Sequence, residues 1–142
     1  MVYDSFSQQE TEDLGCILAQ NADVGSFFAL IGDLGAGKTA FTRGFARGLG
    51  ISGSISSPTF AIVNEYDSGR LPLYHFDVYR IQNAENMQDT GFEDYFYSNN
   101  GIVLVEWANL IKDILPPHAK ILNFQRDLGR DEGYRKITVT GG

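Results

Sequence analysis

One stretch of the chain has the residue types and spacing to bind phosphate. It reads Gly32-Asp33-Leu34-Gly35-Ala36-Gly37-Lys38-Thr39, which is the pattern G-x-x-x-x-G-K-[ST]. The backbone N–H groups of such a loop, together with a helix N-terminus, form a preformed anion site, and glycines let the backbone approach the phosphates. Lys38 would reach the β- and γ-phosphates, and Thr39 would place its hydroxyl on Mg²⁺.

The flanking segments decide between a phosphate site and a plain turn. Residues 26–31 form a short apolar run that predicts a buried strand, and apolar residues from Ala40 to Leu49 recur at helical spacing. The alternative is a glycine-rich turn that only joins a strand to a helix. The order strand, loop, helix, with Lys-Thr opening the helix, favours a phosphate-binding P-loop, and we count Ala40 among its nucleotide contacts.

Two acidic residues end predicted strands elsewhere in the chain. Asp77 follows residues 73–76, and Glu106 follows the apolar run 102–105. P-loop enzymes place a further acid near Mg²⁺ and the attacking water, and ligands bind at the carboxyl ends of strands in open α/β sheets. Asp77 and Glu106 are therefore the candidate catalytic residues. The alternative for each is a solvated turn residue or a helix N-cap.

Other polar and aromatic residues carry weaker signals. Residues 56–59 follow the P-loop helix, where switch segments lie in related hydrolases, but a plain polar loop is an equal alternative. His75 lies in an alternating strand, and we interpret it as a structural histidine, with a catalytic histidine as the alternative. Trp107 is either a core or a partner-facing aromatic residue, and Arg80 could offer its guanidinium to a phosphate or a carboxylate. No zinc-type Cys/His spacing and no Ser/His/Asp arrangement is present in the sequence.

The elements that must position these residues predict one α/β domain, 1–142. Ser7 and Glu10 form a capping-box pattern at the start of a helix over 7–20. Gly50 is expected to stop the P-loop helix. The other expected elements are a lead strand within 1–6, a loop at 51–58, a hairpin of strands 60–66 and 72–77, short helices at 84–89, 92–97 and 109–115, a central parallel strand at 101–106, and a last antiparallel pair at 120–125 and 134–140.

Composition narrows the classes of protein. The 142 residues include a single cysteine, Cys16, so an intrachain disulfide is excluded and a reducing, cytoplasmic setting is expected. The apolar runs are too short to cross a bilayer, so no membrane association is expected. The net charge of −7 lacks the electrostatic footprint of a protein that grips nucleic acid alone. A partner would have to supply any contact with RNA.

Five blocks of sequence together resemble the TsaE (YjeE) family, the small bacterial ATPases of tRNA threonylcarbamoyladenosine synthesis. The resemblance covers nearly the whole chain, and the His-x-Asp-x-Tyr-Arg block with Glu-Trp downstream is more specific than the P-loop. The blocks are residues 32–39, Ser57-Pro58-Thr59, Tyr74-His75-Phe76-Asp77-Val78-Tyr79-Arg80, Gly91-Phe92-Glu93-Asp94-Tyr95-Phe96 and Val105-Glu106-Trp107.

The resemblance implies a P-loop NTPase-like three-layer sandwich, with a mostly parallel central sheet and added antiparallel strands. It implies slow hydrolysis of ATP with Mg²⁺, and it implies TsaD and TsaB as partners that mediate the contact with tRNA. Thr39 and Glu106 would hold the metal, and Asp77 would order the metal's waters or the attacking water. Gln8 and Arg130 would contribute to the nucleotide site.

Two other functions use the same loop. A small metabolite kinase would need an acceptor pocket and usually an Arg-rich lid, and no Arg-rich segment is visible among the 11 Lys and Arg residues. A nucleotide-sensing switch that hydrolyses little needs the same site, so the sequence does not separate it from an ATPase. The guanine-reading pattern [NT]-K-x-D is absent, because Glu65 and Tyr66 follow Asn64, and we expect ATP in preference to GTP.

Overall fold

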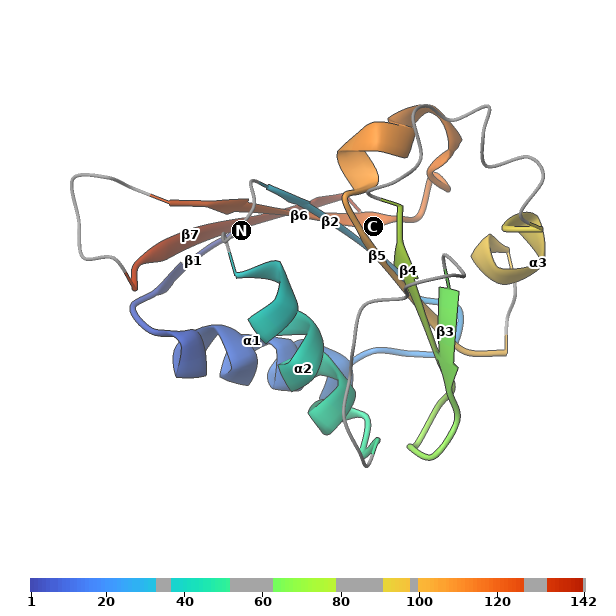
Figure 1. Ribbon diagram of the computed structural model, residues 1–142, viewed down its shortest axis with the longest axis horizontal. Helices are drawn as coiled ribbons and strands as arrows, with labels where there is room; N and C mark the ends of the chain where they lie inside the picture. Colours follow the sequence, from blue (N-terminus) through green and yellow to red (C-terminus); the bar gives the residue numbers. More distant parts are fainter. Residues whose placement is uncertain (33–36, 52–62, 79–90, 98–99, 127–132, 142) are drawn as a thin grey trace.

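A mixed sheet forms the centre of the computed structural model, which describes residues 1–32, 37–51, 63–78, 91–97, 100–126 and 133–141. Within these residues, seven strands form one sheet in the order β1-β7-β6-β2-β5-β4-β3 (Figure 1). The strands are β1 (Val2–Ser5), β2 (Phe27–Gly32), β3 (Val63–Tyr66), β4 (Leu73–Asp77), β5 (Ile102–Glu106), β6 (Lys120–Gln125) and β7 (Arg135–Gly141). The helices are α1 (Gln8–Gln20), α2 (Lys38–Gly48), α3 (Glu93–Phe96) and the 3₁₀ segment η2 (Ala108–Ile114).

The centre of the sheet is parallel and its edges are antiparallel. Strand β2 pairs in parallel with both β5 and β6, and β5 pairs in parallel with β4. Strands β7 and β1 add antiparallel pairs beyond β6, and β3 adds one beyond β4. The carboxyl ends of β2, β4, β5 and β6 therefore meet at one edge of the sheet. Ligands bind at this edge in open α/β sheets.

Helices cover both faces of the sheet, which gives the expected three layers (Figure 1). Phe41 and Phe45 of α2 pack with Leu104 of β5 in one buried cluster, while Phe96 of α3 and Ile111 of η2 pack in the other. Successive side chains of a strand point to opposite faces. Glu106 therefore shares the α1/α2 face with Leu104, and so lies on the same side of the sheet as α2.

Close contact between α1 and α2 fixes the position of α2 under the sheet. A Cβ at Gly44 of α2 would lie 1.8 Å from the carbonyl oxygen of Glu12, and one at Gly15 of α1 would lie 2.3 Å from that of Phe41. Only glycine fits where two helix backbones approach this closely. The start of α1 is capped as predicted, because Ser7 Oγ accepts the Glu10 N–H at 3.1 Å.

Most predicted elements are confirmed, with shifted ends and one change of type. The segment at 109–115 is a 3₁₀ segment, Ala108–Ile114, with non-helical dihedrals at Ile111 instead of a regular short helix. Pro116 favours the extended conformation of Leu115, which ends the segment, and the break at Ile111 leaves a piece on either side that is too short for regular α-helical turns. Strand β6 is also more central than expected, since it pairs with β2 as well as β7.

Some predictions concern residues outside those that the structure describes. They are the loop at 51–58 beyond residue 51, the first part of the strand at 60–66, and the short helix at 84–89. Gly50, the expected stop of the P-loop helix, has φ +79° and follows α2 after one residue, as a helix stop does. In the described part of the chain, every helix is too short or too polar to cross a bilayer.

Candidate functional site

Gly32 and Gly37, the two glycines of the predicted P-loop that the structure describes, both have a positive φ angle. Gly32 ends β2 with φ +143°, and a Cβ there would lie 2.5 Å from the carbonyl oxygen of Phe124 in β6. Gly37 has φ +103° and precedes α2 without any side-chain cap. The first N–H groups of α2 thus lack a side-chain cap, which suits an anion at this helix end. Residues 33–36, predicted nucleotide contacts, lie outside the described residues.

Lys38 begins α2, and its ammonium group lies within the site. The side chain is 5% exposed, and Nζ donates a hydrogen bond to the carbonyl oxygen of Gly32. Nζ also lies 3.6 Å from the centroid of the Trp107 ring. A neutral oxygen and an aromatic face are thus among the contacts of the ammonium. A phosphate oxygen is a stronger partner than either, because charge-assisted hydrogen bonds are about twice as strong as neutral ones.

Trp107 is fixed by an unusual backbone conformation. It has φ 62° and ψ 32°, and among the described residues it is the one non-glycine residue with positive φ. Such a conformation costs about 1–3 kcal/mol and persists where the surroundings hold it. Here it turns the chain sharply after Glu106 and brings the indole over Lys38. The structure does not decide whether Trp107 is a core or a partner-facing residue. It does place the Trp107 ring in the candidate site, over Lys38.

Glu106 and Asp77 lie side by side at the carboxyl ends of β5 and β4. They are register partners in the parallel pair. Glu106 is 4% exposed, and its Oε2 lies 2.6 Å from Nε2 of His75, which is 1% exposed. Asp77 is partly exposed. The two predicted catalytic acids are therefore brought together, and His75 is buried, as expected of a structural histidine, but bonded to one of them.

The other predicted contacts fall at the start of α2 and of α1. Thr39 is exposed, so its hydroxyl is open to a ligand, whereas Ala40 is buried and could offer only its backbone N–H. Gln8 is the exposed first residue of α1. Thr11, one turn further on, lies close to Gly37, since its Cγ2 would be 3.6 Å from a Cβ there. Arg130 lies outside the described residues.

Arg135 is a candidate that the sequence reasoning missed. It begins β7, and its Cγ and Nε would lie 3.7 and 3.9 Å from a Cβ at Gly37. Burial lowers the pKa of the Arg135 guanidinium from its usual value, and the charge of Arg126 lowers it further. Arg135 is thus a second cationic side chain close to Gly37. The antiparallel course of the last strand pair was its one signal, because it returns the start of β7 to the edge where β6 ends.

The donor set at the sheet edge suits a metal that arrives with a nucleotide. Among the described residues, no three His, Cys, Asp or Glu side chains are grouped so as to hold a metal ion. Thr39 and Glu106 offer oxygen ligands, and Mg²⁺ is commonly bound by one or two protein oxygens together with phosphates and water. These residues therefore fit a Mg²⁺–nucleotide complex better than a metal centre built from protein ligands alone.

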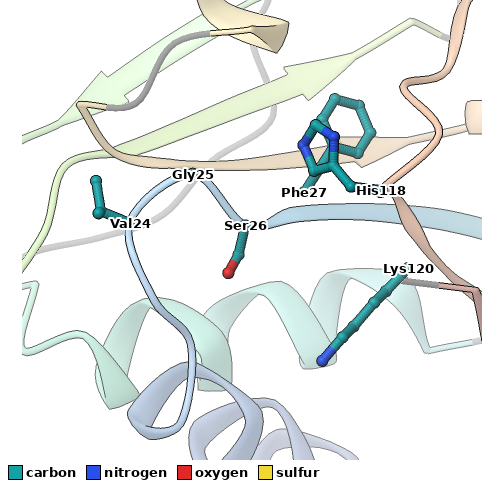
Figure 2. A pocket seen from close by; sticks show the side chains of 6 residues that line it. All are labelled: Val24, Gly25, Ser26, Phe27, His118 and Lys120. Atoms are coloured by element: carbon teal, nitrogen blue, oxygen red, sulfur yellow. The ribbon is translucent and has the colours of Figure 1, made fainter.

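A pocket of about 250 Å³ lies at the opposite edge of the sheet. Its lining comes from the segments that precede β2 and β6 and from the first residue of each strand, and it contains none of the predicted site residues (Figure 2). The ring centroids of Phe27 and His118 lie 6.3 Å apart there, while the Lys120 side chain runs in another direction. The lining residues are Val24, Gly25, Ser26, Phe27, His118 and Lys120.

The three layers, the parallel centre and the strand–loop–helix unit define an α/β protein with a P-loop NTPase-like fold. The chain belongs to the TsaE family. Residues 5–137 match the family described as threonylcarbamoyl adenosine biosynthesis protein TsaE. The family resemblance seen in the sequence is thereby confirmed, and with it the family's role in the biosynthesis of threonylcarbamoyladenosine in tRNA.

Individual relatives agree with the family match. The chain is 47% identical over 132 residues to the tRNA threonylcarbamoyladenosine biosynthesis protein TsaE of Bacillus subtilis, covering 93% of this chain and 80% of that protein. It is 39% identical over 135 residues to the protein of the same name from Treponema pallidum, covering 95% and 96%. The crystal structure of Bacillus subtilis YdiB superposes with a TM-score of 0.83 at 39% identity, covering 99% of this chain and 84% of that one.

Proposed function

We propose that the protein binds and slowly hydrolyses ATP with Mg²⁺, and that it serves tRNA threonylcarbamoyladenosine synthesis together with TsaD and TsaB. The observation that carries the proposal is the meeting of Lys38, Asp77 and Glu106 at one edge of the sheet. A buried ammonium beside a glycine-bounded helix start suits the phosphates, and two adjacent acids suit a metal and a water. The names of the relatives support the tRNA-modification pathway.

Binding would begin with an exchange of partners at Lys38. Nζ would leave the Gly32 carbonyl oxygen and the Trp107 ring for the β- and γ-phosphate oxygens. The backbone N–H groups at the start of α2 would donate hydrogen bonds to further phosphate oxygens. Arg135, beside Gly37, adds positive charge on the same side of the loop. These contacts hold the phosphates without help from either acid.

The two acids would serve hydrolysis. Thr39 Oγ1 and a Glu106 carboxylate oxygen would hold Mg²⁺, which when bound neutralises charge on the β- and γ-phosphates. Asp77, the register partner of Glu106, would orient a water molecule in line with the γ-phosphate. Transfer of a phosphoryl group depends almost wholly on such positioning and electrostatics. Loss of either acid should therefore slow turnover more than it weakens binding.

The test is phosphate release by the wild type and by Asp77→Ala and Glu106→Ala, each alone and with TsaD and TsaB. We expect both variants to bind ATP within about tenfold of wild type, or within roughly 1.4 kcal/mol, and to lose most of their ATPase activity. Glu106→Ala should also weaken the dependence on Mg²⁺, because Glu106 is the proposed metal ligand. Asp113→Ala, which removes an exposed acid of η2, is the matched control and should keep wild-type turnover.

The family resemblance suggests TsaD and TsaB as partners, and the net charge is consistent with a need for them. The net charge of −7 disfavours direct contact with tRNA, so TsaD and TsaB would supply it, and they should raise the wild-type turnover. Full turnover in both acid variants would contradict the site assignment. A wild type indifferent to both partners would contradict the pathway role, and phosphate transfer to small hydroxyl acceptors would then favour a metabolite kinase.

A further inference from the structure

A buried hydrogen bond joins His75 of β4 to Glu106 of β5. Nε2 of His75 and Oε2 of Glu106 are 2.6 Å apart, and the two side chains are 1% and 5% exposed. A bare ring nitrogen and a carboxylate oxygen at this distance would be two acceptors facing each other, so one of them carries a proton. With Glu106 ionised, as a metal ligand must be, the proton is on Nε2 and the imidazole is the donor.

Burial indicates that His75 supports Glu106, and not the reverse. In the described part of the chain, Nδ1 of His75 is buried and has no hydrogen-bond partner. His75 lies in β4 between β5 and β3, where its register partners are Leu104 and Asn64. The His75 side chain is 1% exposed, so burial favours a supporting role over direct contact with a ligand. Glu106 is the last residue of β5 and directly precedes Trp107, whose ring contacts Lys38.

We propose that His75 is a positioning residue for Glu106. Its Nε2–H fixes Oε2 and so fixes the side-chain torsions of the glutamate, which leaves the other carboxylate oxygen for the metal that accompanies the nucleotide. This inference rests on the proposed function, since it assigns a supporting role to a residue of the same site. Groups that hydrogen-bond metal ligands in this way typically change metal affinity by about 10–100-fold when they are replaced.

A matched pair of variants separates this role from simple packing. His75→Gln places an amide N–H donor near the position of Nε2, whereas His75→Asn places its amide near Nδ1 and leaves Glu106 without that donor. The readout is binding of Mn²⁺, as a probe for Mg²⁺, to the ADP complex, followed by the electron paramagnetic resonance of free Mn²⁺. Calorimetric titration of ADP in EDTA reports nucleotide affinity without metal, and thermal unfolding reports the fold.

We expect His75→Asn to weaken Mn²⁺ binding about tenfold or more and His75→Gln to stay within about threefold of wild type. ADP affinity without metal should be unchanged in both. In a Glu106→Gln background, His75→Asn should cause no further loss of metal affinity, because His75 acts through Glu106. Equal Mn²⁺ affinity in the wild type and in His75→Asn would overturn the inference, as would equal losses in Asn and Gln.

A measurement on the wild type covers the case in which His75→Asn does not fold. The sequence has two histidines, and His118 lies in the pocket at the opposite sheet edge, so it serves as an internal control. In ¹⁵N NMR spectra of the ADP complex, His75 should show the proton on Nε2. Its Nε2 signal should shift when Mg²⁺ is added, while the His118 signals stay in place. An unmoved His75 signal would overturn the inference.

The same data distinguish this inference from the proposed function. If Glu106→Gln weakens Mn²⁺ binding and His75→Asn does not, Glu106 is a metal ligand that needs no help from His75, and only the inference fails. If Glu106→Gln itself leaves Mn²⁺ binding unchanged, the metal site assigned to Glu106 is wrong, and the inference fails with it.

Discussion

Replacing Lys38 with alanine tests the centre of the proposed site. The wild-type ammonium would gain hydrogen bonds to charged phosphate oxygens, worth about 1.5–3 kcal/mol, or roughly 10–150-fold in affinity. It would also give up its present contacts with the Gly32 carbonyl oxygen and the Trp107 ring. A cation–π contact of this kind is worth about 0.5–2 kcal/mol. The net loss in Lys38→Ala should therefore be near the lower end, about tenfold or somewhat more.

Two assays measure the effect of Lys38→Ala on ATP binding. Calorimetric titration with ATP gives the affinity directly. Trp107 is the only tryptophan in the sequence, and the Lys38 ammonium lies 3.6 Å from the centroid of its ring. Departure of the ammonium toward phosphate should change the indole emission when ATP is added to the wild type. Lys38→Ala should lack that part of the change, because it has no ammonium to move.

The control is Lys112→Ala, which removes an exposed lysine of η2 and should leave ATP affinity and emission as in the wild type. A folded Lys38→Ala protein with wild-type ATP affinity would refute the reasoning, because the residue would then have no role in holding phosphate. An affinity loss equal to that of Lys112→Ala would refute it as well, since the effect would reflect total charge.

Three further predictions follow from the structure. GTP should compete with ATP only weakly, and equal competition in a displacement titration would contradict the preference for adenine. Gly44→Ala should lower the free energy of unfolding by about 2 kcal/mol or more, because the new Cβ would clash with the backbone of Glu12. The gain in helix propensity, about 1 kcal/mol, is too small to offset this clash. A variant that unfolds at or above the wild-type temperature would contradict the prediction. Arg135→Gln should weaken ATP binding less than Lys38→Ala does, and an unchanged affinity by calorimetry would remove Arg135 from the site.

The parts of the site that follow from chain direction were predictable from the sequence. A strand, a glycine-rich loop and a helix in that order have one common arrangement, and Gly32 and Lys38 lie where it requires. Asp77 and Glu106 were each found as the last residue of a strand. Parallel pairing then brings them together at one edge, whatever the details of side-chain packing.

The parts that depend on pairing between distant strands were not predictable. The sequence gives His75 an alternating position in a strand, but the bond to Glu106 requires β4 to lie beside β5 in one particular register. The antiparallel pair of β6 and β7 was expected, but Arg135 reaches Gly37 only because β6 also lies beside β2, and that pairing had no signal in the sequence. The positive φ of Trp107 had no signal either, since glycine is the usual residue in that conformation.

Local charge in the site runs against the charge of the whole chain, and this bears on how the nucleotide is held. The net charge of −7 opposes an anionic ligand at a distance, but salt screens such repulsion beyond about 8 Å at physiological ionic strength. Within that distance Lys38, Arg135 and the start of α2 attract phosphate, whereas Glu106 and Asp77 repel it. A divalent cation held by Thr39 and Glu106 would offset that repulsion by supplying positive charge. The adjacent acids are therefore the physical reason to expect that hydrolysis depends steeply on Mg²⁺ while metal-free binding rests on the cations alone.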